Sequence, residues 1–294
     1  MKRKPIALIA AYVMVMFAVL TGCNNQQQQE SQQSVEATYA EVRNRFLAQE
    51  GYAFYGRTKL LAGDTANGNL VNFSGQKQGK ELFMNVKLSF PEQKRVDSMS
   101  LFAQGERLYA KFDDREPWQP VNNRTFSLQQ ELNNWSPQFN FEQMEEMRTR
   151  VVPLEDKIQD DQIAAFRVLL DSNKLKSWLV QQMKNQVGGQ IQTLYNPKLK
   201  LAMKLSDEEM SELKQGARVQ AAQTMREIDE IIDHMELEAE YTVYYDTKQM
   251  LPTGMVMNIR SEYDLDDQRV FEHSQIETFL RNYGRQPSMP RPGQ

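Results

Sequence analysis

The sequence predicts an α+β protein built on an antiparallel β-sheet, and three observations lead to that class. Apolar and polar residues alternate over 82–90 and 237–245, which is the period of a half-buried strand. The strands on either side of Gly105-Glu106 are too closely spaced for the crossover helix that a parallel pair needs. Between the two sets of strands, 206–233 carries apolar residues at helical spacing.

Length and composition indicate a globular body and exclude several kinds of site. The chain has 294 residues, enough for one or two domains, and 40% of them are hydrophobic. A single cysteine excludes an intramolecular disulfide framework and Cys-cluster metal sites, and two isolated histidines disfavour a His-rich metal centre. With 35 Lys+Arg against 39 Asp+Glu, the chain lacks the basic surface of a general nucleic-acid binder. We therefore expect no metal, no cofactor and no nucleic-acid partner.

The N-terminus has the pattern of an export signal. Lys2, Arg3 and Lys4 precede an uncharged stretch from Ile6 to Leu20. A membrane-spanning helix needs about 20 apolar residues, so this stretch fits a cleaved signal peptide over 1–22 better than a permanent anchor.

The residues that follow suggest how the mature chain is held. Leu20-Thr21-Gly22-Cys23 resembles the lipobox of bacterial lipoproteins, in which the cysteine thiol receives a diacylglyceryl group and the signal is cut before it. The resemblance implies that Cys23 is the lipid anchor, carrying acyl chains such as palmitate, and that the protein faces outside the cytoplasm on a bacterial membrane. An uncleaved signal anchor with an incidental cysteine is the alternative.

The mature chain is expected to contain one domain between two polar ends. Residues 23–34 form a Gln-rich segment with little to bury, which predicts a flexible tether. Residues 35–284 carry all the predicted strands and helices and are expected to form a single α+β domain. The last segment, 285–294, contains three prolines and is predicted to be a disordered tail.

The first half of the domain is predicted to be a helix followed by a meander. Residues 35–49 have an amphipathic pattern, and period-two alternation follows it. In the last strand of this half, Leu108, Ala110 and Phe112 are expected to face inward. The expected strands are 52–61, 82–90, 97–104 and 107–112, with earlier turns at Asn67-Gly68 and Gln78-Gly79.

The second half is predicted to carry helices and then a second meander. Ser206 and Glu209 have the spacing of a capping box and begin a long helix to about Asp233. Because its outer face is acidic, we expect this helix to lie on the sheet like a lid, solvated outside. The other expected elements are helices over 125–134, 141–148 and 173–186, and strands over 163–170, 237–245, 254–263 and 269–276.

Two stretches carry a resemblance to a known family. LFAQGERLYAKFDDREPWQPV (101–121) and YYDTKQMLPTGMVMNI (244–259) resemble recurring segments of LolA/LppX-like lipoprotein and lipid carriers. The resemblance implies a curved, open half-barrel of antiparallel strands, covered on its concave face by helices. It also implies a cavity for acyl chains between the sheet and the helices around Trp178 and 206–233. The long Gln-rich and charged middle of this chain departs from the family.

No catalytic arrangement is visible in the sequence. Adjacent carboxylates such as Asp113-Asp114 point to opposite faces of a strand and do not converge on one bond. No serine-nucleophile signature accompanies His234 or His273, and no phosphate-binding glycine motif is present. We therefore expect a protein that is not an enzyme.

Methionine and aromatic residues in the predicted elements could line an adaptable apolar cavity, because methionine side chains fit varied ligands. This predicts a lipoprotein that binds a hydrophobic ligand, with a lipid as the expected partner. The alternative is a filled core in a lipoprotein that docks another cell-envelope protein. The candidate ligand-binding residues are Met84, Leu101, Tyr109, Trp118, Trp178, Met225, Tyr241, Val243 and Met257.

Overall fold

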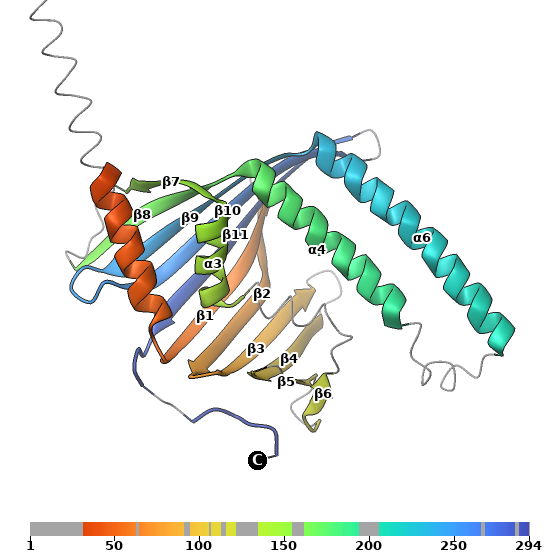
Figure 1. Cartoon of the computed structure of the whole chain (residues 1–294), viewed down its shortest axis with the longest axis horizontal. Coiled ribbons are helices and arrows are strands. Elements are labelled where there is room, and N and C mark those ends of the chain that lie inside the picture. Colours follow the sequence, from red (N-terminus) through yellow and green to blue (C-terminus); the bar gives the residue numbers. More distant parts are fainter. Residues whose placement is uncertain are drawn as a thin grey trace, which may run out of the picture.

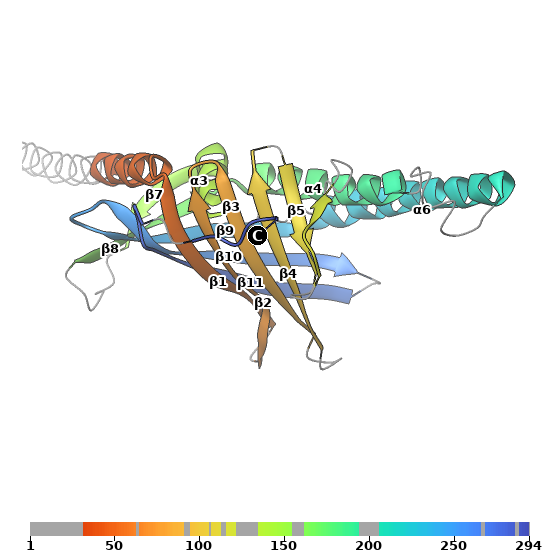
Figure 2. The same cartoon turned by 90° about the horizontal axis from the view of Figure 1, so that it is seen from below.

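One antiparallel sheet organises the molecule. In the computed structural model, the sheet has eleven strands in the order β6-β5-β4-β3-β2-β1-β11-β10-β9-β8-β7. It is open and strongly curved, and the helices lie on its concave side (Figures 1 and 2). The predicted α+β class, with a curved open sheet covered on one face, is confirmed. The structure describes residues 32–62, 65–90, 95–105, 107–112, 116–121, 135–154, 162–193, 206–265, 268–285 and 288–293.

The first meander runs outward from the middle of the sheet to one edge. Its four predicted strands are confirmed, and Gly79 makes the expected turn with a φ of 57°. The expected turn at Asn67-Gly68 is wrong, because both residues lie inside a strand. Leu108 and Ala110 are buried as predicted, but Phe112 is 53% exposed because its strand ends at Lys111. The strands are β1 (Gly51–Ala62), β2 (Thr65–Gln78), β3 (Glu81–Phe90), β4 (Arg95–Gln104), β5 (Arg107–Lys111) and β6 (Gln119–Val121).

Two glycines let aromatic rings lie directly on the sheet. A Cβ at Gly56 would come within 2.4 Å of the Phe73 ring, and one at Gly75 within 2.3 Å of the Phe54 ring. Gly56 pairs with Phe73, and Phe54 pairs with Gly75. Each glycine therefore makes room for the ring opposite it. In β2 this leaves an alternation too irregular to be recognised from the sequence.

The second half supplies the helices and the second meander. The predicted strand 163–170 has the predicted ends, and the predicted helix 173–186 extends further at both ends. The helix expected over 125–134 lies outside the described residues. The elements are α3 (Pro137–Met147), β7 (Arg148–Pro153), β8 (Ile163–Leu170), α4 (Ser172–Thr193), α6 (Asp207–His234), β9 (Glu236–Asp246), β10 (Leu251–Leu265) and β11 (Gln268–Arg281).

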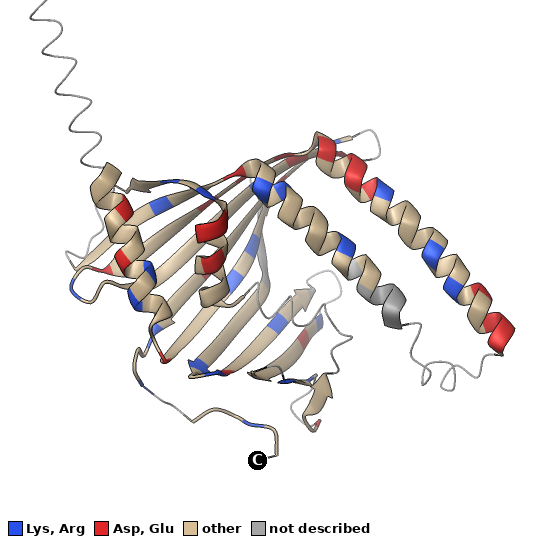
Figure 3. Cartoon of the chain, in the orientation of Figure 1, with Lys and Arg blue, Asp and Glu red and all other residues tan. Residues whose placement is uncertain are grey.

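The long helix α6 begins as predicted but does not lie where predicted. Ser206 and Glu209 form both hydrogen bonds of the capping box. Its C-terminal end packs on the sheet, where Ile228 and Ile232 belong to the hydrophobic core. The rest of α6 projects beyond the sheet beside α4, so the prediction that the whole helix lies over the sheet is wrong (Figure 1). Opposite charges join the two helices: Lys184 of α4 contacts Asp229 of α6 at 2.6 Å. Figure 3 shows lysines along α4 and acidic residues gathered near both ends of α6.

An N-terminal helix, residues 32–47, covers one end of the concave face. Its residue Phe46 lies 5.0 Å from Phe141 of α3 and 5.0 Å from Tyr52 of β1, measured between ring centroids. All three side chains are at most 2% exposed. This helix, α3 and the sheet therefore enclose a filled aromatic core.

The same helix also covers the outer edge of the sheet at β7. The Gln32 side chain donates to the Val151 carbonyl at 2.8 Å, and the Val151 amide donates to Glu36 Oε1 at 3.3 Å. Arg148 forms an ion pair with Glu36. These side chains satisfy backbone groups that an edge strand would otherwise expose to another chain.

The other end of the chain also contacts the domain. Met289 is only 6% exposed, and Arg291 contacts Glu81 of β3 at 2.8 Å. The sequence predicts a disordered tail over 285–294. Within 288–293, Met289 is buried and Arg291 meets Glu81, while the other residues are exposed or half-buried.

Candidate ligand-binding site

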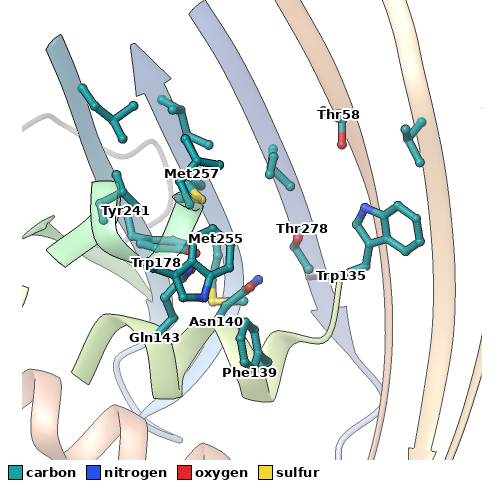
Figure 4. A pocket seen from close by; sticks show the side chains of 16 residues that line it. Thr58, Trp135, Phe139, Asn140, Gln143, Trp178, Tyr241, Met255, Met257 and Thr278 are labelled. Carbon is teal, nitrogen blue, oxygen red and sulfur yellow. The ribbon is translucent and has the colours of Figure 1, made fainter. Parts of the chain in front are cut away.

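A cavity of about 300 Å³ lies between the sheet and helices α3 and α4. Its lining is mostly aliphatic and aromatic, and Figure 4 shows these side chains converging from strands and helices. The lining residues are Thr58, Val71, Trp135, Phe139, Asn140, Gln143, Leu175, Trp178, Leu179, Leu237, Tyr241, Met255, Met257, Ile259, Ile276 and Thr278.

The register of the sheet explains why residues distant in sequence meet here. Residues paired across antiparallel strands point to the same face. Tyr241 pairs with Met257, which pairs with Ile276, and Thr58 pairs with both Ile276 and Val71. Five adjacent strands, from β9 to β2, therefore place one row of side chains on the floor of the cavity.

The two helices supply the opposite wall. Phe139, Asn140 and Gln143 come from consecutive turns of α3, and the lining residues described on α4 come from its first two turns. Just before α3, Trp135 stacks on Phe73 of β2 with 6.3 Å between ring centroids and 23° between ring planes. The cavity is thus bounded by α3 on the side of the filled core and by α4 on the other.

A buried hydrogen bond fixes α3 to the floor. Tyr241 is 2% exposed, and its hydroxyl donates to Gln143 Oε1 at 2.8 Å. Burial raises the pKa of the Tyr241 phenol well above its ordinary value of 10.0, so the hydroxyl stays protonated and remains a donor.

Three of the candidate residues named from the sequence line the cavity: Trp178, Tyr241 and Met257. Met84, Leu101 and Val243 also belong to the hydrophobic core and are 0% exposed, but they are not among the lining residues. Met225 is half-buried on α6, and α6 contributes no lining residue.

The remaining two candidates, Tyr109 and Trp118, lie on the other face of the sheet. Tyr109 pairs with Phe102, whereas the inward-facing Leu108 and Ala110 pair with Ala103 and Leu101. Phe102 lies 6.4 Å from Tyr109 and 6.3 Å from Trp118 between ring centroids. Because side chains alternate along a strand, Tyr109 must face the opposite side from its inward-facing neighbours Leu108 and Ala110. The sequence therefore already predicted the outward position of Tyr109.

Sequence reasoning missed the polar and helical part of the lining. Asn140 and Gln143 are three residues apart and therefore share one face of α3, but nothing in the sequence marks that face as the one toward the sheet. For the floor a signal was available: Met255, Met257 and Ile259 alternate along β10 as expected for one face of a strand.

The described part of the chain shows neither a metal site nor a membrane-spanning helix. No group of three or more His, Cys, Asp or Glu side chains there could hold a metal ion. None of the helices described has the length and hydropathy needed to cross a membrane.

Comparison with known proteins gives distant structural likenesses. No family model and no curated protein sequence matches this chain. Among solved structures, the Mycobacterium tuberculosis lipoprotein LppX is 10% identical with a TM-score of 0.41, covering 86% of this chain and 98% of that one. A LolA superfamily protein from Nitrosomonas europaea is 7% identical with a TM-score of 0.26, covering 87% and 94%. A DUF1329 family protein from Desulfovibrio piger is 6% identical with a TM-score of 0.28, covering 86% and 95%.

The first two of these belong to the groups that the sequence resembles. At TM-scores below 0.5, these likenesses do not define what this chain binds.

Proposed function

We propose that this protein is a non-catalytic, extracytoplasmic lipoprotein that binds a hydrophobic ligand, a lipid, between its sheet and helices α3 and α4. The observation that carries the proposal is the apolar cavity of about 300 Å³ beside a tightly filled core. A filled interior, the alternative that the sequence left open, does not account for that space.

The physical argument starts from the cost of leaving the cavity empty. Apolar walls offer water few hydrogen bonds, so filling the space with an apolar chain is favourable by about 25 cal/mol for each Å² removed from water. The volume lies at the lower end of the range of about 300–1,000 Å³ typical of small-molecule sites. This size suits one hydrocarbon chain better than several.

The lining also favours tolerance of chain shape. Met255 and Met257 on the floor are unbranched and polarizable, so they can adjust to chains of different length or unsaturation. We expect selection by chain character and volume and not by one exact structure.

The membrane anchor in the proposal rests on Cys23 and its flanking residues, which lie outside the described part. Two acyl chains on one cysteine give stable membrane attachment. Only residues 24–31 separate Cys23 from the first described residue, Gln32. An acylated Cys23 would therefore hold the domain close to the membrane surface.

Ligand binding is tested by mass spectrometry of the mature chain, exported without an acylation site and recovered from the cell envelope without detergent. We expect a co-purifying lipid at near-stoichiometric amount. Ile276→Trp fills the cavity and should abolish co-purification, whereas Gln275→Trp, the next residue on the opposite face, should not. Repeated recovery of a folded, ligand-free wild type would contradict the proposal.

The anchor is tested separately with Cys23→Ala in the full chain. We expect an uncleaved precursor that carries no acyl group, detected as a change in mobility on gels and by loss of metabolic labelling with palmitate. Normal processing and labelling in this variant would remove Cys23 as the anchor without affecting the evidence for ligand binding.

A further inference from the structure

The described lining of the cavity is polar in places but carries no charged side chain. None of its sixteen described residues is Asp, Glu, Lys, Arg or His. Its polar groups are the hydroxyls of Thr58, Thr278 and Tyr241, the amides of Asn140 and Gln143, and the indole N–H groups of Trp135 and Trp178. All seven are neutral at physiological pH.

Charged residues next to the cavity face away from it. Arg57 and Lys59 flank Thr58 on β1, and alternation sends their side chains to the convex face. There both contact the single carboxylate of Glu277 at 2.5 Å, which holds the two cations on the face away from the cavity. A ligand anion in the cavity would therefore have no cation within the described lining to replace its water.

The two amides of α3 are the hydrogen-bonding groups best placed to meet a ligand. Both side chains are 6% exposed, and Figure 4 shows them projecting from α3 toward the strands that carry Met255 and Thr278. The oxygen of Gln143 already accepts from Tyr241. No other residue of the described ranges forms a hydrogen bond with the side chain of Asn140, so none of them competes with a ligand acceptor in the cavity for its amide N–H groups.

Burying an ion without a partner is far more costly than burying a carbonyl that receives a hydrogen bond. We propose, on the basis of the proposed function, that the cavity selects lipids whose buried part is uncharged and carries a carbonyl acceptor, as in acyl esters and amides. Asn140 donates to that carbonyl. Ligands whose ionised group would have to enter the cavity, such as free fatty acids, are discriminated against.

The test compares three ligands with the same twelve-carbon chain length. A chain starting at residue 24, which retains every described residue, is loaded with the uncharged fluorescent probe N-phenyl-1-naphthylamine. The probe is displaced at pH 8 by methyl laurate, laurate or dodecane, below their aggregation concentrations. We expect methyl laurate to act at about tenfold lower concentration than laurate, because the carboxylate lacks a cationic partner. The displacing concentration of dodecane should lie between those of methyl laurate and laurate, since dodecane carries neither a charge nor an acceptor for Asn140.

Two variants test the residues that carry the inference. Asn140→Leu should lower the affinity for methyl laurate about three- to tenfold, which corresponds to the loss of one net hydrogen bond. The affinity for dodecane should stay the same or rise. Thr58→Lys introduces a cation into the lining and should raise the affinity for laurate, relative to that for methyl laurate, about tenfold or more. Gln275→Lys, on the opposite face of the neighbouring strand, is the matched control. It should change neither the affinity for methyl laurate relative to dodecane nor that for laurate relative to methyl laurate.

The outcomes separate this inference from the proposed function. If methyl laurate and laurate displace the probe equally well from the wild type, the proposed selectivity is wrong. Binding of the probe itself would still support a hydrophobic site. An unchanged ester affinity in a folded Asn140→Leu variant would remove Asn140 as the donor. Failure of the probe to bind the folded wild type at all would overturn the proposed function itself.

Discussion

The concave face of the sheet has two regions that differ in how fully they are packed. Beneath the N-terminal helix and α3, Tyr39, Phe46 and Phe141 are at most 1% exposed, and their rings lie in contact with other rings. On the other side of α3, beneath the start of α4, a cavity of about 300 Å³ remains. We call these the filled region and the hollow region.

The course of the helices explains the difference. The N-terminal helix lies along the sheet (Figure 1), and Val35, Tyr39, Val42 and Phe46, spaced along its length, are all buried. Helix α4 leaves the sheet after its first turns and continues beside α6 (Figure 1). Among the side chains described on α4, Leu175, Trp178 and Leu179 reach the cavity, and they do not fill the space. Apolar residues at helical spacing therefore produce either a core or a cavity, depending on the direction in which the helix runs.

The largest effect is expected from removing a ring in the filled region. Phe141→Ala should lower the free energy of unfolding by about 3–5 kcal/mol, because the surrounding rings cannot close the space. Leu179→Ala, at the hollow region, should cost only about 1 kcal/mol, since that side chain is half-buried and borders the cavity. Denaturant unfolding measures both. Equal losses would show that the two regions are packed alike.

Adding volume should distinguish the regions in the opposite way. Val42→Phe, in the filled region, should destabilise by about 1–3 kcal/mol, because Val42 is 0% exposed and has no space beside it. Ile276→Phe directs its extra atoms into the cavity and should change stability by less than about 0.5 kcal/mol while reducing probe binding. Strong destabilisation by Ile276→Phe would mean that the hollow region has no usable space.

A smaller effect should come from the convex face behind the hollow region. Glu277 lies between two lining residues, Ile276 and Thr278, and contacts Arg57 and Lys59. Burial opposes its ionisation, but hydrogen bonds from Lys59 and Arg57 outweigh burial and hold the pKa of the Glu277 carboxyl below its ordinary value of 4.5. A lowered pKa adds stability above pH 4.5 that is lost as the pH falls through the folded-state value.

Glu277→Gln should therefore cost about 1 kcal/mol at pH 7, a modest value because Arg57 is 43% exposed. The difference from wild type should shrink as the pH falls below 4.5, which thermal unfolding across pH 3–7 would measure. Glu262→Gln, whose partner Arg269 lies near the exposed end of the strands, is the control and should change little. A pH-independent loss in Glu277→Gln would show that packing, not charge, supports this wall.

Much of the fold followed from local patterns. Strands with regular alternation, such as 82–90 and 237–245, were predicted because one face is buried and the other solvated. The start of α6 was predicted because Ser206 and Glu209 satisfy the first backbone amides locally. Strand β2 was missed because Gly75 occupies an inward position that the Phe54 ring of β1 covers, and β7 was missed because it is a short edge strand.

The site was only partly predictable. Trp178, Tyr241 and Met257 were named because they occupy apolar positions in regular elements. Tyr109 and Trp118 were placed on the wrong face, and the alternation in β5 would have corrected Tyr109. Asn140 and Gln143 were missed because a polar pair on a helix is most often solvated, and only the docking of α3 turns it toward the sheet.

The sequence by itself determined the class of the fold, the ends of most elements and which face of each regular strand is apolar, because these depend on residues close in the chain. Only the tertiary structure decided the strand order, the route of α4 and α6 away from the sheet, and so the existence and uncharged lining of the cavity. These depend on contacts between residues such as Gln143 and Tyr241, separated by 98 positions, and local periodicity carries no information about such pairs.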